Sequence, residues 1–247
     1  MTKQFPQIAE ADLEAALEEC GLSKMNPTVG FNCLYINTGF HKIMIDCGYA
    51  NEQLSQSMEA AGIRYEDIEA VLITHGDGDH IGGVINFPNA QFYIPEKAYQ
   101  LWTSQDGQEK MVEEFKNVFQ HILPPEMLPK KLAGRLQYGT TILPSIKNRI
   151  HLIDTRRPIF PGIRMIEAFG HRSDHYAIKI ESEGETLLHI VDAFRHPIQV
   201  LHPEWYSFVD SYPQQTVGTI KALLARAKEK GAMVFGAHFE FPGLVTI

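Results

Sequence analysis

The chain has 247 residues, 44% hydrophobic and 21% charged, so it is long enough to bury a large core and has the composition of an ordinary globular protein. Its formal net charge of −8 does not favour binding to nucleic acid or to an anionic membrane surface. Its three cysteines include no CxxC pair, and it contains no run of about 18 apolar residues. We therefore expect a soluble, cytoplasmic protein without a disulfide framework.

Hydrophobic periodicity predicts alternating helices and strands over the first 94 residues. A helix over residues 9–19 is followed by strands over 31–36 and 42–46, which the turn-prone segment Asn37-Thr38-Gly39 joins. A second helix over 51–61 precedes strands over 68–74 and 90–94.

The pattern changes between about residues 95 and 148. Helices are expected near 96–103 and 108–119, followed by the proline-rich stretch HILPPEMLPKK, and such an insertion often forms a wall or lid of a binding site. Strands are then expected at 150–153, 163–167, 176–180 and 186–191. A last helix over 215–230 and a last strand over 232–236 follow. This order predicts a single domain over residues 1–247, built as a layered α/β sandwich with a helical insertion.

The segment THGDGDHIGG, residues 74–83, directly follows a predicted apolar strand. It places four potential metal ligands within six residues: His75, Asp77, Asp79 and His80. Imidazole and carboxylate together suit Zn, Fe or Mn, and the absence of cysteine argues against a closed structural zinc site. The alternative is a polar glycine-rich turn whose aspartates only cap the backbone.

This segment resembles the His-x-His-x-Asp-His motif of the metallo-β-lactamase superfamily, and further parts of that family's pattern occur in order. Residues 170–175, GHRSDH, resemble its Gly-His-Thr-x-Gly-His stretch. Residues 188–192, LHIVD, resemble the strand that ends in a metal-bridging aspartate, and 235–243, FGAHFEFPG, resemble the last ligand loop. Upstream, IDCG at 45–48 resembles the strand that ends in Asp-x-Gly.

The resemblance implies a four-layer αββα sandwich with two divalent metal ions (Zn, Fe or Mn). One ion would be held by Asp79, His80 and His238, the other by His75, Asp77 and His171, and Asp192 would bridge both. Asp46 and His175 would lie behind these ligands. With Asp79 and Asp192 as catalytic residues, a hydroxide between the metals would attack an ester, lactone, thioester or phosphotriester.

One position departs from the family pattern, because Asp77 stands where the motif has its second histidine. A carboxylate is a harder ligand than imidazole and favours Fe or Mn, and the related flavodiiron proteins carry a glutamate there. It also adds a third negative charge to the ligand set. The alternative is that Asp77 is not a ligand and that its site is weak or empty.

The run HFEFPG at 238–243 is similar to the branch that includes methyl parathion hydrolase and relatives acting on lactones and esters. Trp102, Phe239 and Phe241 are candidates for the substrate pocket, although such aromatic residues are more often simply core residues. We expect a small-molecule substrate and no nucleic-acid or membrane partner. The oligomeric state is left open, with a homodimer as one alternative. Two rival functions are an iron-dependent redox enzyme of the same fold and a metabolite-binding protein with slow turnover.

Overall fold

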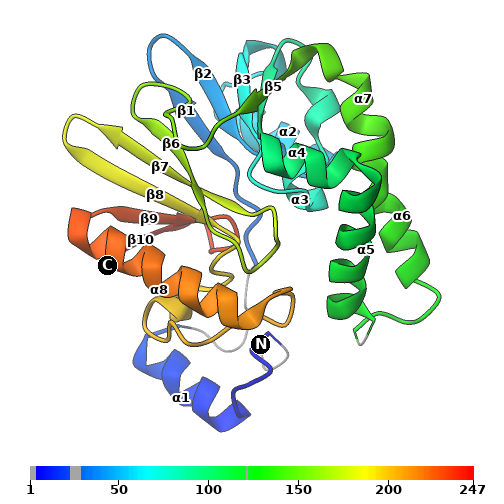
Figure 1. The fold of residues 1–247 in the computed structure, drawn as a ribbon. Coiled ribbons are helices and arrows are strands. Elements are labelled where there is room, and N and C mark those ends of the chain that lie inside the picture. The colour runs from blue at the N-terminus through cyan, green and yellow to red at the C-terminus, as the bar shows by residue number, and fades with distance from the viewer. Residues whose placement is uncertain (1–3, 23–28, 121) are drawn as a thin grey trace. The chain divides into compact units, whose positions relative to one another are not determined.

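The computed structural model describes residues 4–22, 29–120 and 122–247 (Figure 1). The chain divides into two compact units. We call residues 33–155 the central unit, and residues 1–32 together with 156–247 the terminal unit. Each unit contains one five-stranded sheet, and each is described by itself.

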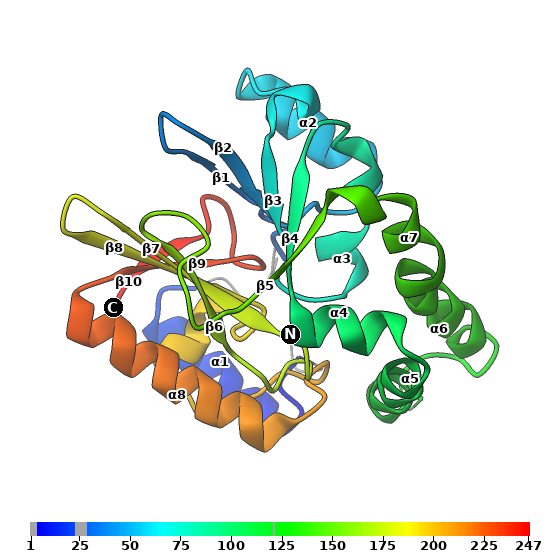
Figure 2. The same ribbon diagram turned by 45° about the horizontal axis from the view of Figure 1, so that its top comes forward.

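The sheet of the central unit has its strands in chain order. These are β1 (Leu34–Asn37), β2 (Lys42–Ile45), β3 (Ala70–Leu72), β4 (Gln91–Pro95) and β5 (Ile150–Ile153). Only β1 and β2 pair antiparallel, and the other neighbours are parallel. All residues of β3 are buried, as expected for an inner strand of a parallel sheet (Figure 2). The loops after β2 and β3 therefore leave the same edge of the sheet, where the predicted ligand motif begins.

The helices of the central unit include the predicted insertion. They are α2 (Glu52–Ala60), η1 (Tyr65–Asp67), α3 (Gly78–Ile81), η2 (Val84–Asn86), α4 (Glu96–Thr103), α5 (Gln105–Phe119), α6 (Leu128–Gln137), the π-helical η3 (Tyr138–Ile142), α7 (Leu143–Ser145) and η4 (Lys147–Arg149). The two predicted insertion helices are confirmed as α4 and α5. The proline-rich stretch is not wholly irregular, because α6 begins within it with Pro129 in its first turn, where proline is tolerated.

Trp102 belongs to the core of the central unit. Its side chain is 1% exposed, and a Cβ at Gly139 would clash with the Trp102 carbonyl, so this glycine permits a close approach of η3 to α4. Its indole is covered by protein, which favours the alternative that Trp102 is a core residue.

The sheet of the terminal unit has the order β10 (Leu244–Thr246), β9 (Met233–Gly236), β8 (Glu185–Val191), β7 (Tyr176–Ser182) and β6 (Ile163–Glu167). Only β8 and β9 pair parallel. Helix α8 (Pro213–Lys230) buries Ile220, Leu223 and Ala227 in one hydrophobic cluster with residues of this sheet. Phe239 is buried in the same cluster, which favours a core role for this residue too.

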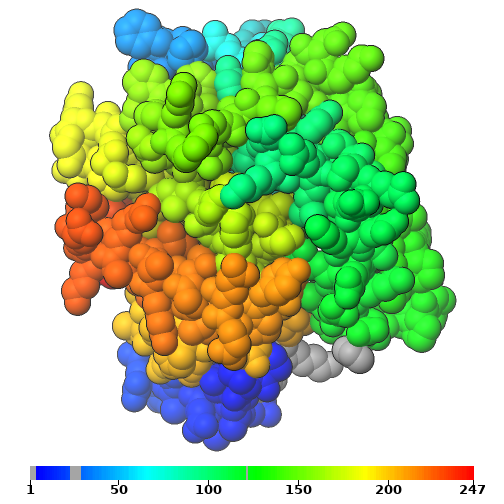
Figure 3. All heavy atoms as spheres, in the orientation of Figure 1, coloured from blue at the N-terminus to red at the C-terminus, as the bar shows by residue number. Residues whose placement is uncertain are grey.

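A second cluster of the terminal unit holds its N-terminal segment. Helix α1 (Glu10–Glu19) packs Leu13 and Leu17, together with Phe5, against Ile198 of η5 (Pro197–Val200) and Trp205. The blue surface of this segment adjoins yellow and orange surface of the same unit in Figure 3. The segment thereby supports residues 193–210, which leave β8 at the candidate site. Within the described residues, every helix is too short or too polar to cross a membrane.

Candidate functional site

In the central unit, the candidate ligands lie on a loop and helical turn that follow β3. Asp77 occupies the N-cap position of α3, and Asp79 and His80 lie within that helix. A Cβ at Gly83 would clash with the Cys47 carbonyl, so this glycine lets the end of the motif pack on the segment after β2. The Cys47 N–H donates to the His80 carbonyl at 2.7 Å, which fixes the two segments together.

The carboxylate of Asp46 organises the ligand motif of the central unit. It is buried at the end of β2 with φ of 63°, a left-handed conformation that aspartate tolerates better than most residues. It accepts hydrogen bonds from the Thr74 backbone N–H at 2.8 Å and the Thr74 hydroxyl at 2.7 Å. Its Oδ2 also lies 2.7 Å from Nδ1 of His80. A carboxylate only accepts, so Nδ1 of His80 carries the proton and Nε2 of the neutral ring carries a lone pair.

The hydroxyl of Thr74 extends this order to His75. Since that hydroxyl donates its proton to Asp46, it acts as the acceptor for Nδ1 of His75, 3.2 Å away. The neutral His75 ring therefore also presents the lone pair of Nε2. The two rings lie close together, with centroids 4.0 Å apart and planes tilted by 43°.

The two carboxylates of the motif face these imidazoles. Oδ2 of Asp77 lies 3.9 Å from Nε2 of His75, and Oδ2 of Asp79 lies 3.7 Å from Nε2 of His80. The other oxygen of Asp77, Oδ1, accepts a hydrogen bond from Nη1 of Arg135, which also forms an ion pair with it. In each pair, an imidazole nitrogen lies near a carboxylate oxygen, and both are atoms that can bind a divalent ion.

Nearby thiols do not belong to this donor set. Burial raises the pKa of the Cys33 thiol to about 12, and the negative charge of Asp46 adds to the shift. Burial also raises the pKa of Cys47 well above its usual range, with Asp46 again contributing. Without a metal, both thiols stay protonated at neutral pH, so neither is an activated nucleophile.

In the terminal unit, Asp192 follows β8 immediately after an irregularity in the pairing of β8 with β9. Val191 has φ of 53°, and such a distortion re-aims the residue that follows it. The backbone N–H of Asp192 donates to Nε2 of His175 at 3.0 Å, while Nδ1 of His175 donates to the Ala168 carbonyl at 2.8 Å. Both ring nitrogens of His175 therefore serve to position Asp192.

The two histidines predicted as ligands in this unit are held in the same tautomer. Nδ1 of His171 lies 2.9 Å from Oδ1 of Asp210, whose Oδ2 accepts the Ser207 N–H at 2.7 Å. Nδ1 of His238 lies 2.9 Å from the Gly30 carbonyl. Carboxylate and carbonyl oxygens only accept, so both rings carry a proton on Nδ1, and a neutral ring then has its lone pair on Nε2.

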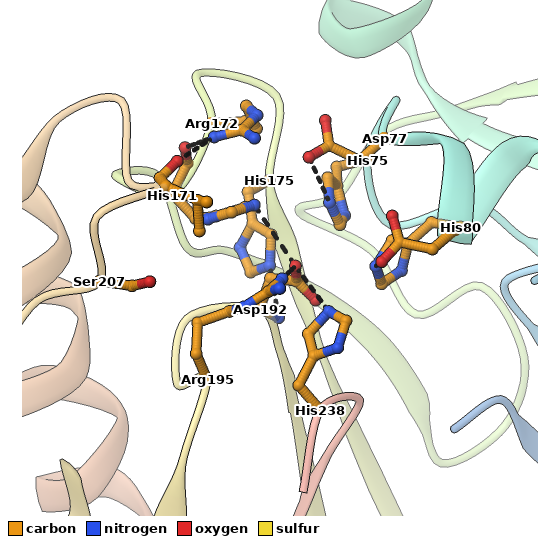
Figure 4. A network of polar contacts seen from close by, with 12 residues as sticks. His75, Asp77, His80, His171, Arg172, His175, Asp192, Arg195, Ser207 and His238 are labelled. Atoms are coloured by element: carbon orange, nitrogen blue, oxygen red, sulfur yellow. Dashed lines mark hydrogen bonds and ion pairs between the residues drawn. The ribbon is translucent and has the colours of Figure 1, made fainter. Parts of the chain in front are cut away.

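These lone pairs converge on one oxygen (Figure 4). Oδ2 of Asp192 lies 3.3 Å from Nε2 of His171 and 3.1 Å from Nε2 of His238. Three acceptor atoms at such distances repel one another unless a cation or a proton lies among them. Arg195 supplies part of that positive charge, because its Nη1 donates to the same oxygen. Carboxylate and imidazole donors in this tautomer fit a divalent metal ion.

Arg172 stands where the family pattern has threonine, and it holds the surrounding loops together. Its buried Nη1 donates to the carbonyls of His171 at 2.7 Å and Val209 at 2.6 Å, and to Oγ of Ser211 at 3.1 Å. The loop of His171 is thereby tied to the loop that carries Asp210. The guanidinium is an internal brace rather than a group offered to a ligand.

In each unit, some residues around the predicted ligands have no counterpart in the sequence prediction. Thr74, Asp210, Arg135 and Arg195 each contact a predicted ligand or the residue that orients it. Of the three predicted pocket residues, only Phe241 is exposed, at 85%.

Comparison with known proteins places the chain in a family. The family model of the metallo-beta-lactamase superfamily matches residues 29–238, and the chain belongs to this superfamily. The predicted fold class is thereby confirmed.

Three relatives illustrate the similarity. A probable metallo-hydrolase of Mycobacterium bovis is 22% identical over 145 residues, which cover 59% of this chain and 43% of that protein. The chain thus matches less than half of that relative's length. The structure of AidC, a dizinc quorum-quenching lactonase in complex with a product, N-hexanoyl-L-homoserine, has a TM-score of 0.85 at 23% identity, covering 99% of this chain and 84% of that one. The hydrolase AbOPH has a TM-score of 0.79 at 22% identity, covering 98% and 84%.

Proposed function

We propose that the chain is a hydrolase with two divalent metal ions that cleaves an ester or lactone bond of a small molecule. In this proposal one ion is held by Asp79, His80 and His238 and the other by His75, Asp77 and His171, with Asp192 shared. The assignment of ligands to ions follows the superfamily pattern. The choice of ester or lactone follows the similarity in fold to AidC, which is a lactonase.

The observation that carries the proposal is the meeting of three acceptor atoms at Asp192. Its Oδ2 lies within 3.3 Å of the Nε2 atoms of His171 and His238, and both rings carry a proton on Nδ1, which leaves Nε2 as the acceptor of a neutral ring. The central unit supports the same chemistry independently, because Asp46 fixes His80 directly and His75 through Thr74. Four imidazoles held in the metal-binding tautomer are hard to explain as a structural polar cluster.

When bound, the two ions would supply a nucleophile from water at neutral pH and polarise the oxygen of the scissile bond. The chain's own residues have other tasks. Asp46 and Asp210 hold the imidazoles in orientation, and His175 holds the backbone of Asp192. Arg195, whose side chain is partly exposed, places a cation next to Asp192, where a developing oxyanion would be stabilised.

The test is metal analysis of protein purified without chelators, joined to a panel of acyl lactones, aryl esters and phosphotriesters. We expect two divalent ions per chain and turnover of a lactone or ester that chelation abolishes and metal restores. Asp192→Ala should lose metal and activity together while Asp106→Asn, an exposed carboxylate on α5, should keep both.

The outcomes separate the rival functions. Saturation at one ion per chain would overturn the two-ion assignment, and an Asp192→Ala variant with full metal and full activity would remove Asp192 from the ligands. A fully loaded protein that turns over nothing in the panel would overturn the hydrolase. Bound iron with oxygen uptake would favour a redox enzyme of this fold instead.

A further inference from the structure

Arg135 of α6 is a buried arginine that belongs to the helical insertion yet binds the ligand motif. Its residue is 6% exposed, and its guanidinium lies over the ring of Phe115 in α5, 5.7 Å from the ring centroid. Helices α5 and α6 lie side by side in Figures 1 and 2. Arginine is rarely this buried unless its charge is paired, so the groups that pair with Arg135 indicate its role.

The partners of Arg135 are consecutive residues of the ligand loop. Nη1 donates to the Gly76 carbonyl at 2.9 Å and to Oδ1 of Asp77. The next residue is also covered by the insertion, because a Cβ at Gly78 would lie 2.9 Å from the hydroxyl of Tyr138. Three residues in a row, Gly76 to Gly78, are therefore shaped by α6 and the turn that follows it. The insertion reaches the backbone of the motif as well as one side chain.

The pair also changes the charge of the ligand set. Asp77 replaces a neutral imidazole by a carboxylate, but the guanidinium of Arg135 cancels that added negative charge at hydrogen-bond distance. Counting the ligands alone would give three negative charges, whereas counting Arg135 restores the balance expected for a histidine at this position. Bonding at Oδ1 leaves Oδ2 as the oxygen that faces His75, 3.9 Å from its Nε2. Two ligand atoms on one tetrahedral ion would lie roughly 3.4 Å apart, close to that separation.

We propose that Arg135 is a positioning residue that holds Asp77 as a single-oxygen metal ligand, with the pair acting as a charge-neutral substitute for the missing histidine. This inference rests on the proposed function, since it takes Asp77 as a ligand. It makes the helical insertion a structural part of the metal site rather than only a cover over it.

The proposal predicts that the effect of removing Arg135 depends on which residue stands at position 77. With Asp77 present, Arg135→Met frees Oδ1, so the carboxylate can bind through both oxygens and the coordination number rises. With histidine at 77, Arg135 becomes an unpaired buried cation beside the metal, and its removal should improve binding. A residue that merely supports the fold would act in the same direction in both backgrounds.

The experiment compares Arg135→Met, Asp77→His and the double variant with the wild type, and uses Lys110→Met as the control. Lys110 is an exposed cation on α5, so its removal matches the charge change without touching the motif. Visible absorption of the Co²⁺-loaded proteins reports coordination, because cobalt bands weaken as the coordination number rises. Competition with a chromophoric chelator gives the affinity for Zn²⁺.

We expect weaker, shifted cobalt bands in Arg135→Met and an unchanged spectrum in Lys110→Met. Asp77→His alone should bind Zn²⁺ weakly, and adding Arg135→Met should recover affinity by about tenfold, the lower end of the range for residues behind metal ligands. If Arg135→Met does not fold, the comparison of Asp77→His with the double variant decides, because neither protein leaves a carboxylate at position 77 unpaired.

This inference would be overturned, and the proposed function left standing, by the following combination of results. The wild type binds two ions, Arg135→Met does not change the cobalt spectrum, and the double variant does not recover affinity for Zn²⁺. A wild type that binds no metal would overturn the proposed function and this inference with it.

Discussion

Replacing Asp210 by asparagine tests whether the protein controls the tautomer of His171. The two side chains have the same shape, so packing is preserved, but asparagine has one acceptor and one donor where aspartate has two acceptors. Oδ2 of Asp210 accepts the backbone N–H of Ser207 at 2.7 Å, and a backbone donor cannot be reversed. The asparagine oxygen must therefore face Ser207, and its NH₂ group must face Nδ1 of His171.

That arrangement converts Nδ1 of His171 from donor to acceptor and moves the ring proton to Nε2. The Nε2–H would then point at Oδ2 of Asp192, now 3.3 Å away, and form a hydrogen bond where a metal would bind. Loss of a carboxylate behind a metal-bound histidine typically weakens metal affinity by about 10- to 100-fold, or roughly 1.4 to 2.7 kcal/mol. We expect a loss within this range for the ion that the proposed function assigns to His171.

The assay is Zn²⁺ competition with a chromophoric chelator, with thermal unfolding of the metal-free protein as the measure of folding. Asp106→Asn removes an exposed carboxylate of the insertion and should leave the affinity as in the wild type. A well-folded Asp210→Asn variant that binds Zn²⁺ as tightly as the wild type would refute the tautomer argument.

Two further predictions concern Thr74 and His196. Thr74→Val removes the hydroxyl between Asp46 and His75, so it should lower the free energy of unfolding by about 1 to 3 kcal/mol and weaken metal binding. Thr74→Ser keeps the hydroxyl and should preserve both. Equal behaviour of the two variants in chelator competition and urea unfolding would exclude a role for the hydroxyl. Burial lowers the pKa of His196 to about 4, so the unfolded chain takes up a proton between pH 6.5 and 4 that the native state does not, and stability is full above pH 6.5 and falls below it. His196→Asn keeps an acceptor for the Ile198 N–H. Between pH 7 and 4.5, the free energy of unfolding of the metal-free variant, measured in urea, should fall by about 2 kcal/mol less than that of the wild type. Parallel pH profiles of the two proteins would count against this role of His196.

The sequence predicted the parts of the site that depend on local order. His75, Asp77, Asp79 and His80 fall within six residues, and Asp46 ends a strand in an Asp-x-Gly pattern, so each is visible without a structure. Residues 78–81 form a helical turn that the sequence did not predict. That turn is too short for periodicity to indicate it.

The residues that escaped prediction act over long distances in the chain. Asp210 meets His171 from 39 residues away, and Arg135 meets Asp77 from 58 residues away. A single aspartate in a loop or a single arginine on a helix has no spacing that would identify it. The prolines before Arg135 also concealed α6, although proline is accepted in the first turn of a helix.

Aromatic residues were the least predictable part of the candidate site. Trp102 and Phe239 are both buried, while Phe241, two residues beyond Phe239, is almost fully exposed. An aromatic ring has the same composition signal in a core and in a pocket, so sequence alone does not separate the two.

The terminal unit is assembled from both ends of the chain, and this has a consequence for biosynthesis. His238 is oriented by the Gly30 carbonyl across 208 residues, and the Asn32 amide donates to the carbonyls of Gly236 and Phe239. A ribosome releases residues 33–155 as an uninterrupted stretch, so that unit can fold while translation continues. Gly30 and Asn32 are synthesised early, but the last strands, which they contact, are synthesised at the end of translation. The nascent protein therefore carries Asp77, Asp79 and His80 well before it can offer His238, and under the proposed assignment metal captured early would meet only part of its ligand set.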